Sequence, residues 1–434
     1  MSGIQKALIE ELSGLLDNPG CIFCRGETET IRRYWFWYLS EQYGSADTRR
    51  ALRLAVGFCP SHSYQLAASA PASTLAIIYE DLLADGVRHL SQPRANQASQ
   101  EPCPLCQAIQ RYNEYLLFML EHGWSNPNIK QRIIAGNTVC VPHFWSLTRR
   151  ESFSRLTMLM DMAQHPASPG KDEFQEQSLS WLIQEVSQPD WHSLAVLPKT
   201  PSHRPVLQYL EELLARESCP LCVAEIEAEQ RYFEWLLQNR QTEFSHALDF
   251  CRAHVRHFLR HSGAVGEEFE QTMIDHLRAR TRTVYDAGLT NRVKMAPPSR
   301  NHKLTFQINA ALNRKYCPVC SYQNSIVDRL SQLIAIGTLD SRVLSDYQVH
   351  GGVCYRHLAG VLTATPGRAN PSIHDIALTE LQVLEWEIKE FIGRLDWNRR
   401  YEPKGSEQQA PYRAATRFSG LVLHPKLVGA AGPP

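Results

Sequence analysis

All twelve cysteines of this chain fall into one repeated pattern. A CxxC motif is followed, 28 to 34 residues later, by a CxxH motif, and this arrangement occurs four times. Repeat by repeat, the sixteen candidate metal ligands are Cys21, Cys24, Cys59 and His62; Cys103, Cys106, Cys140 and His143; Cys219, Cys222, Cys251 and His254; and Cys317, Cys320, Cys354 and His357. No cysteine is left over, so the sequence predicts four repeats with one shared chemistry.

The spacing within each motif suits a metal ion. Ligands at positions i and i+3 near a helix start lie on one face and can reach one ion. The positive end of the helix favours the thiolate over the thiol. Three cysteines and one histidine form a standard closed tetrahedral zinc set. We therefore expect each CxxC to meet the CxxH of its own repeat around one zinc ion, four ions in all, with no pairing between repeats.

Three other uses of these cysteines stay open. Three cysteines and a histidine can hold an iron–sulfur cluster, CxxC pairs can act as redox dithiols or disulfides, and buried cysteines can serve in packing alone. Packing alone does not explain the coupled histidines, and the βαβ context of thioredoxin-type redox pairs is missing. Zinc is the favoured cofactor, and an iron–sulfur cluster is the less favoured alternative.

The pattern of apolar residues predicts an all-α fold of four helical repeats. Apolar helical patterns precede the CxxC motifs at Ile4 to Leu16, Val206 to Leu214 and Phe306 to Leu312. A long helix is expected to run on from each CxxC, as in Cys106 to Glu121, and then break at glycine. A shorter return helix should lead to CxxH, and a further helix should follow it, as in Ser73 to Leu90 or Ile373 to Leu395.

Turn-forming residues place the expected boundaries. The first two repeats cover 1–90 and 91–164, and a segment rich in Pro, Ser and Gln follows at 165–205, with one short helix expected near Glu173 to Val186. The third and fourth repeats cover 206–295 and 296–398. The tail, 399–434, has no sustained period, and we expect it to be disordered or draped on the surface.

Overall composition limits the protein class. Apolar residues make up 43% of the chain, enough for packed cores, and the net charge is zero. A neutral chain argues against a protein-wide field for nucleic acid or an acidic membrane. No uncharged apolar stretch is long enough for a transmembrane helix, and residues 1–16 lack a signal-peptide core. The sequence therefore predicts a cytoplasmic protein with no membrane partner, where cysteines favour metal over disulfides.

The residues around the motifs repeat as well, and they resemble a known family. The repeated positions are Pro104, Pro220 and Pro318 within CxxC, and Phe58, Val139, Phe250 and Val353 before CxxH. With the string Gly57 to Leu66 and the helix Ala76 to Leu83, they resemble an uncharacterised prokaryotic family of helical CPxC…FCxxH proteins, a domain of unknown function. The resemblance is best over Pro19 to Ala287. It implies paired repeats and a metal site, but no activity.

Two further features have a plain structural interpretation. The aromatic run Tyr34 to Tyr38 has counterparts at equivalent helix positions of the next two repeats, which favours packing over a ligand platform. Arg252, Arg256 and Arg260 line one helical face and are the best candidate for a nucleic-acid patch. Pairing with the acidic residues of the same repeat, Glu225, Glu227 and Glu229, is the favoured explanation because the chain is neutral.

These patterns leave three hypotheses for function. No nucleophile elbow, P-loop, dinucleotide fingerprint or HExxH motif is present, so no catalytic residue is predicted. The favoured hypothesis is a non-catalytic, zinc-stapled helical scaffold that binds another macromolecule, most simply a protein. The alternatives are a redox- or metal-responsive regulator that uses the Cys3His sites, and an iron–sulfur electron carrier or enzyme.

Overall fold

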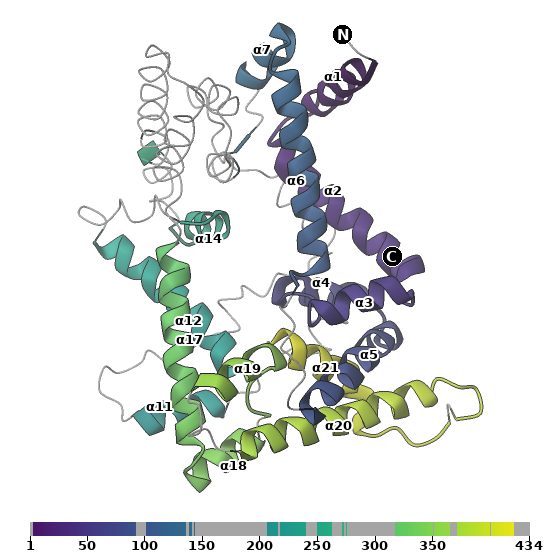
Figure 1. Cartoon of the computed structure of the whole chain (residues 1–434), viewed down its shortest axis with the longest axis vertical. Helices are drawn as coiled ribbons and strands as arrows, with labels where there is room; N and C mark the ends of the chain where they lie inside the picture. The colour runs from purple at the N-terminus through teal and green to yellow at the C-terminus, as the bar shows by residue number, and fades with distance from the viewer. Residues whose placement is uncertain are drawn as a thin grey trace, which may run out of the picture. The chain divides into compact units, whose positions relative to one another are not determined.

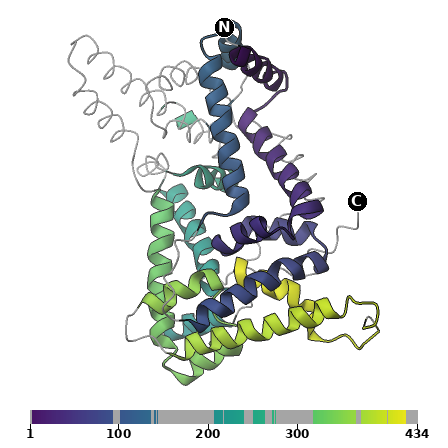
Figure 2. The ribbon, with the colours of Figure 1, turned by 45° about the vertical axis from the view of Figure 1, so that its right-hand side comes forward.

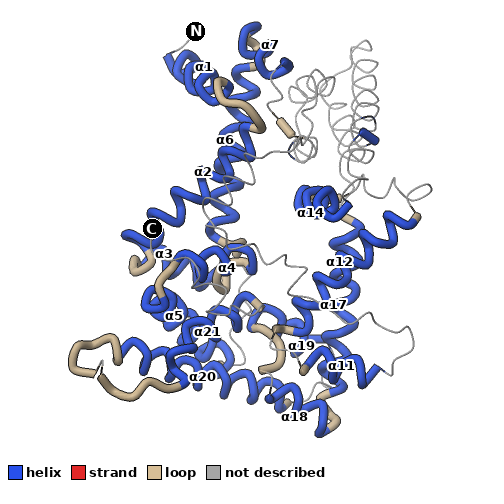
Figure 3. Tube along the Cα trace, turned by 180° about the vertical axis from the view of Figure 1, so that it is seen from behind, coloured by secondary structure: helices blue, strands red, loops and turns tan. Residues whose placement is uncertain are grey.

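The computed structural model shows the chain as a set of helices (Figure 1). The described residues are 3–92, 101–135, 139–140, 143, 206–215, 218–239, 250–262, 271–272, 275, 317–349, 351–364, 371–399 and 401–420. Within these ranges the chain forms helices joined by turns and no β-strand, which confirms the predicted all-α class (Figure 3). No helix in the same ranges is long and apolar enough to cross a membrane.

The first half of the chain holds a helix before the first CxxC, a long helix after each CxxC, and shorter return helices. In chain order these are α1 (Gly3–Leu16), α2 (Ile22–Trp37), the π-helical turn η1 (Tyr38–Gln42), α3 (Ala46–Leu54), α4 (Pro60–Ser69), α5 (Ala72–Ser91), α6 (Pro104–Gly123) and α7 (Pro127–Ala135).

The second half repeats this order. Its described elements are α11 (Val206–Leu214), α12 (Pro220–Gln238), α14 (Arg252–Ser262), α17 (Pro318–Gly337), α18 (Ser341–Val349), α19 (Tyr355–Ala364), α20 (Ser372–Gly393), the 3₁₀ turn η5 (Ser406–Gln409) and α21 (Ala410–Ser419). The predicted helix at Phe306 to Leu312 and the segment 165–205 lie outside the described residues.

The chain divides into two compact units, each built from three separate stretches. Unit 1 comprises residues 1–30, 109–178 and 230–322, and unit 2 comprises residues 31–108, 179–229 and 323–434. The division falls inside α2, α6, α12 and α17. Compact units and sequence repeats therefore do not coincide, because every repeat contributes residues to both units.

Equivalent packing recurs in the two halves. In unit 1, α1 packs on α7, and a Cβ at Gly123 would come within 2.5 Å of Leu12 Cδ2. In unit 2, α11 packs on α18, and a Cβ at Gly337 would come within 2.6 Å of Leu210 Cδ2. In both halves a leucine of the first helix fills the space at the glycine that ends the long helix. This match shows that the halves are copies of one design.

The most extensive helix packing lies in unit 2, where α5 packs along α20 and both touch α21 (Figure 2). Ile373, Ala377, Leu381 and Ile388 give α20 a fully buried stripe at helical spacing. Tyr79 and Tyr355 pack their rings against Phe418 of α21. The C-terminal helix is therefore part of the core of this unit.

For residues 401–420, this finding corrects the expectation that residues 399–434 are disordered or draped on the surface. Residues 406–409 and 410–419 are the helical elements η5 and α21, and Arg394, at the end of α20, forms an ion pair with Glu407 at 2.7 Å. Arg417 lies 2.7 Å from Glu380 on α20. Ion pairs and one short helix hold this segment in place, so its sequence needs no long periodic pattern of apolar residues. Residues 421–434 lie outside the described part of the chain.

The aromatic run after the first CxxC has a packing role, as predicted, for part of its length. Trp35 and Tyr38 are buried, and their rings lie 5.1 Å and 5.4 Å from that of Phe58, the residue before Cys59. Phe36 and Trp37 are exposed instead, because a helix turns successive residues to different faces. Phe250, the equivalent residue before Cys251, packs on Phe233 in the same way.

Candidate metal centres

Helix starts position the ligands. The long helices start directly after the first cysteine of each CxxC, at Ile22, Pro104, Pro220 and Pro318. The carbonyl oxygens of those four cysteines accept the first helical hydrogen bonds, from the backbone N–H groups of Arg25, Gln107, Val223 and Ser321. Proline suits the first helical position because no N–H partner is needed there. The first cysteine of a motif therefore directly precedes the helix and the second lies in its first turn, where the helix dipole favours thiolate.

The sixteen candidate ligands gather into four groups of four. The groups are Cys21, Cys24, Cys140 and His143; Cys59, His62, Cys103 and Cys106; Cys219, Cys222, Cys354 and His357; and Cys251, His254, Cys317 and Cys320. Within each group the ligand atoms all lie within 4.8 Å of one another. Each group could therefore hold one metal ion.

The grouping corrects the expected pairing within repeats, which is wrong. Each CxxC meets the CxxH of the neighbouring repeat in its half of the chain. The two helices of the second repeat differ in length: α6 has 20 residues and its return helix α7 has 9. At 1.5 Å per residue these span about 30 Å and about 14 Å. The return helix alone therefore covers about half the length of α6, and Cys140 meets Cys21 and Cys24 of the first repeat.

In each half of the chain, one group joins the first CxxC motif to the last CxxH motif. These two groups are called the outer groups here. The first, in unit 1, joins Cys21 and Cys24 to Cys140 and His143. Sγ of Cys24 lies 3.6 Å from Sγ of Cys140, and the three sulfur atoms lie 3.1 to 3.5 Å from Nδ1 of His143. All four ligands are buried.

A carboxylate contacts the ring nitrogen of this histidine that points away from the sulfur atoms. Oε1 of Glu27 lies 3.1 Å from Nε2 of His143, and Asn113 donates a 2.7 Å hydrogen bond to the same oxygen. The ring of Phe23 stacks on the imidazole at 5.3 Å. A carboxylate on the far nitrogen fixes the tautomer and orientation of a ligating histidine. Nδ1 then faces the three sulfur atoms of the group.

The second outer group, in unit 2, is built in the same way from Cys219, Cys222, Cys354 and His357. Sγ of Cys222 lies 3.8 Å from Sγ of Cys354, and Nδ1 of His357 lies 3.4 Å from each of those sulfur atoms. Oε1 of Glu225 lies 3.5 Å from Nε2 of His357. Glu225 follows Cys222 by three residues, as Glu27 follows Cys24.

In each half, the other group joins the first CxxH motif to the CxxC motif that follows it. These two groups are called the inner groups. Sγ of Cys59 lies 3.8 Å from Sγ of Cys106, and Sγ of Cys251 lies 3.9 Å from Sγ of Cys320. These four cysteines are half-buried, whereas every outer ligand is buried. Among the described residues, neither inner histidine has a carboxylate partner, and Ile109 and Gln323 occupy the positions that correspond to Glu27 and Glu225.

These distances suit one tetrahedral ion. Sulfur at about 2.3 Å and nitrogen at about 2.0 Å from a tetrahedral zinc ion lie about 3.8 Å (S to S) and about 3.5 Å (S to N) from one another. In each group one sulfur pair lies 3.6 to 3.9 Å apart, and the sulfur-to-imidazole separations are 3.1 to 3.5 Å. All twelve cysteines are free, and a disulfide would need sulfur atoms about 2.0 Å apart.

The electrostatics of the groups also call for a cation. Burial favours neutral imidazole, but neighbouring thiolates outweigh it and raise the pKa of His62 to about 9 and that of His254 to about 10. Hydrogen bonds from Cys106 and Cys59 lower the pKa of Cys103, and the hydrogen bonds with Cys103 and Cys59 raise the pKa of Cys106. Adjacent thiolates cannot all ionise without a positive charge among them. A divalent ion bound among the four ligands would supply that charge.

Gly420, which ends α21, closes over the second outer group. Its carbonyl oxygen accepts a 2.9 Å hydrogen bond from the backbone N–H of Cys219. Its φ of +84° favours glycine, and a Cβ at this position would overlap Sγ of Cys222 and come within 3.1 Å of Sγ of Cys354. Sequence reasoning missed Gly420 and both glutamates. The CxxCxxE spacing of the outer motifs was the available signal for the glutamates.

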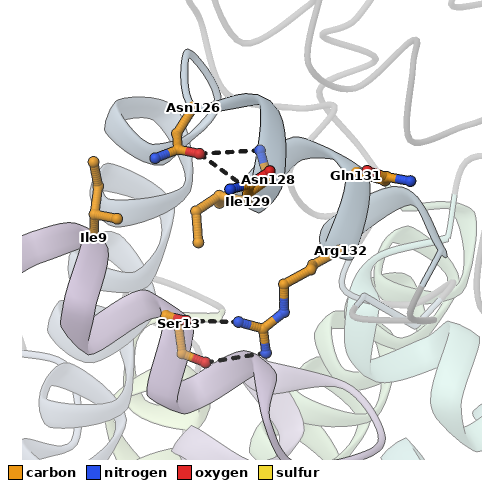
Figure 4. A pocket seen from close by; sticks show the side chains of 7 residues that line it. All are labelled: Ile9, Ser13, Asn126, Asn128, Ile129, Gln131 and Arg132. Carbon is orange, nitrogen blue, oxygen red and sulfur yellow. Dashed lines mark hydrogen bonds between the residues drawn. The ribbon is translucent and has the colours of Figure 1, made fainter.

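A surface groove of about 690 Å³ lies between α1 and α7 in unit 1 (Figure 4). The side chains of Arg132, Ser13 and Asn126 in its lining are engaged in structural bonds. Arg132 donates to Ser13 Oγ at 2.6 Å and to Asp17 at 2.6 Å, and Asn126 Oδ1 accepts from the backbone N–H groups of Asn128 and Ile129.

The arginine face predicted at Arg252, Arg256 and Arg260 lies on α14, but those side chains are outside the described residues. Its expected partner Glu225 instead contacts His357, and Arg356 at 3.8 Å. The carboxylate thus belongs to the metal centre.

One family matches the chain. The model of a family of unknown function, DUF6062, matches residues 207–424. The match covers the third and fourth repeats, whereas the resemblance in sequence was expected to be best over residues 19–287. The matched segment contains one complete crossed pair of repeats together with Gly420. No curated protein and no solved structure matches the chain.

Gly420→Ala tests the closure of the second outer group. The positive φ alone costs about 1–2 kcal/mol for alanine, and the added methyl group displaces the sulfur of Cys222. We expect one metal ion fewer per chain and a lower melting temperature, measured by elemental analysis and circular dichroism. Gly14→Ala, on an exposed helix position with nothing within 4 Å, is the control and should be neutral or slightly stabilising. Full metal content and an unchanged melt for Gly420→Ala would contradict this role.

Proposed function

The chain belongs to the DUF6062 family, whose function is unknown, and we propose that it is a non-catalytic helical scaffold held together by four structural zinc ions. The observation that carries the proposal is the convergence of every cysteine into four closed Cys3His sets. Structural zinc sites contribute folding free energy directly, since the ligands come together only in the folded chain.

The size of each group favours a single ion over an iron–sulfur cluster. A cluster distributes its ligands over several iron atoms bridged by sulfide. Here the four ligand atoms of every group lie within 4.8 Å of one another. Thiolate donors also disfavour magnesium and calcium, which prefer oxygen. Four protein ligands complete a tetrahedral zinc shell and leave no position for substrate, which supports a structural role.

The surface of unit 2 supports a protein as the partner. Trp386 on α20 and Trp397 and Tyr401 in the loop that follows are 62%, 68% and 78% exposed. Arg399 in this loop donates to Glu390 and Glu402 at 2.9 to 3.0 Å, which holds the aromatic side chains in an ordered segment. Exposed aromatic residues on a preorganised surface are typical of protein interfaces. Nucleic acid is the less favoured partner, because the chain has no net charge.

The twelve free cysteines support a reducing compartment, and we propose the cytoplasm. The alternative function, a redox- or metal-responsive regulator, draws support from the half-buried cysteines of the inner groups.

Elemental analysis tests the zinc scaffold. Full-length protein purified without chelator should be colourless and hold about four zinc ions, one for each group. Removing the metal with a strong chelator should reduce the helical signal in circular dichroism, because the ligands then repel one another. A brown protein that absorbs near roughly 400 nm would indicate iron instead. One zinc ion or none would contradict the proposal.

Substitution of the exposed aromatics tests the partner. In cells that express the full chain, protein cross-links identified by mass spectrometry should concentrate at residues 383–401. Trp386→Ala combined with Trp397→Ala should remove most of them while zinc content and melting stay unchanged, because both side chains are exposed. Val349→Ala, at a similarly exposed position on α18, is the matched control. Cross-links to nucleic acid, or protein cross-links unaffected by the aromatic variant, would contradict a protein partner at this surface.

A further inference from the structure

We propose that the four centres form two classes, in which the outer groups keep their zinc permanently and the inner groups exchange it with the surroundings. This inference rests on the proposed zinc scaffold and adds a regulatory property to it. Each half of the chain would then carry one permanent ion and one exchangeable ion.

Burial is the first difference between the classes. All eight outer ligands are buried, whereas each inner group has two half-buried cysteines. These are Cys59 and Cys106 in unit 2, and Cys251 and Cys320 in unit 1. The same two motif positions are open in both halves: the first cysteine of CxxH and the second cysteine of CxxC. The opening is thus a feature of the design and not of one copy.

Access decides how zinc leaves a closed tetrahedral site. An incoming donor must approach the ion and form a transient five-coordinate state, which zinc tolerates. The adjacent pairs Cys59–Cys106 and Cys251–Cys320 present such an edge to solvent, with sulfur atoms 3.8 Å and 3.9 Å apart. The outer ions can be reached only after local unfolding of the surrounding helices, which costs free energy.

The second, independent difference is a carboxylate that contacts the non-ligating nitrogen of the histidine. Glu27 and Glu225 contact the far nitrogen of the outer histidines at 3.1 Å and 3.5 Å. Among the described residues the inner histidines have no such partner. Loss of an outer-shell carboxylate typically costs 10- to 100-fold in metal affinity, so the inner sites should bind zinc more weakly by about this factor. Burial and hydrogen bonding therefore act in the same direction.

Loss of the inner ions alone would leave each half joined by its outer group. The outer groups connect α2 to His143 and α12 to α19, and so hold the two ends of each half. The inner groups connect α4 to α6 and α14 to α17 in the middle of each half. Release of two ions would therefore loosen the contact between neighbouring repeats without separating the ends.

Chelator competition on the zinc-loaded full chain tests this division. Zinc transfer to 4-(2-pyridylazo)resorcinol, followed by absorbance, should show two ions released quickly and two released at least about tenfold more slowly. Glu27→Gln should move one ion from the slow phase to the fast phase. Glu10→Gln, at an exposed position paired with Lys6, is the matched control and should leave both phases unchanged.

Alkylation gives a second readout that does not depend on either variant. Iodoacetamide forms a carbon–sulfur bond with a thiolate and releases iodide. In the zinc-loaded chain it should modify Cys59, Cys106, Cys251 and Cys320 before any other cysteine, as mapped by mass spectrometry. Four ions leaving in one phase, or early alkylation of outer cysteines, would overturn the two classes while leaving the zinc scaffold intact. Fewer than four bound ions before competition would instead refute the scaffold.

Discussion

The structure depends on one kind of contact, in which two helix starts from neighbouring repeats present four soft ligands to the same small space. One helix contributes two thiolates of CxxC, and the other contributes the thiolate and imidazole of CxxH. Without a cation the thiolates repel one another, and with one they tie two helices of different repeats together. Because each repeat supplies one motif to each of two groups, no repeat is closed by itself. The smallest closed assembly is a pair of repeats, and the family match over residues 207–424 spans one such pair.

Sequence reasoning could identify the parts of this design, but not how they are joined. Helices such as α1, α5 and α20 were predicted to within a few residues, because their apolar periods and flanking prolines are local signals. All sixteen candidate ligands also fall into the four groups. The pairing was wrong because within-repeat closure has the shortest loop, yet the cost of closing a loop rises only slowly with its length.

Long-range packing explains the other differences. The C-terminal segment reads as polar and irregular, but α21 is buried against α5, and Gly420 closes over Cys222. No local sequence pattern predicts the contact between Gly420 and Cys222, because the two residues are about 200 positions apart. Glu27 and Glu225 are likewise ordinary helical glutamates until the crossed pairing places a histidine beside each. The two acidic residues then separate otherwise similar Cys3His sets into supported, buried centres and more open ones.

Zinc counting on paired variants tests the crossed arrangement most directly. Cys24→Ala combined with His143→Ala removes two ligands of one group, and the chain should retain three zinc ions. Cys24→Ala combined with His62→Ala removes one ligand from each of two groups, and the chain should retain two. The same comparison in the second half uses Cys222→Ala with His357→Ala or with His254→Ala. The reverse result, with three ions kept in the Cys24 and His62 variant and two in the Cys24 and His143 variant, would show that each repeat closes on itself and would contradict the crossed arrangement.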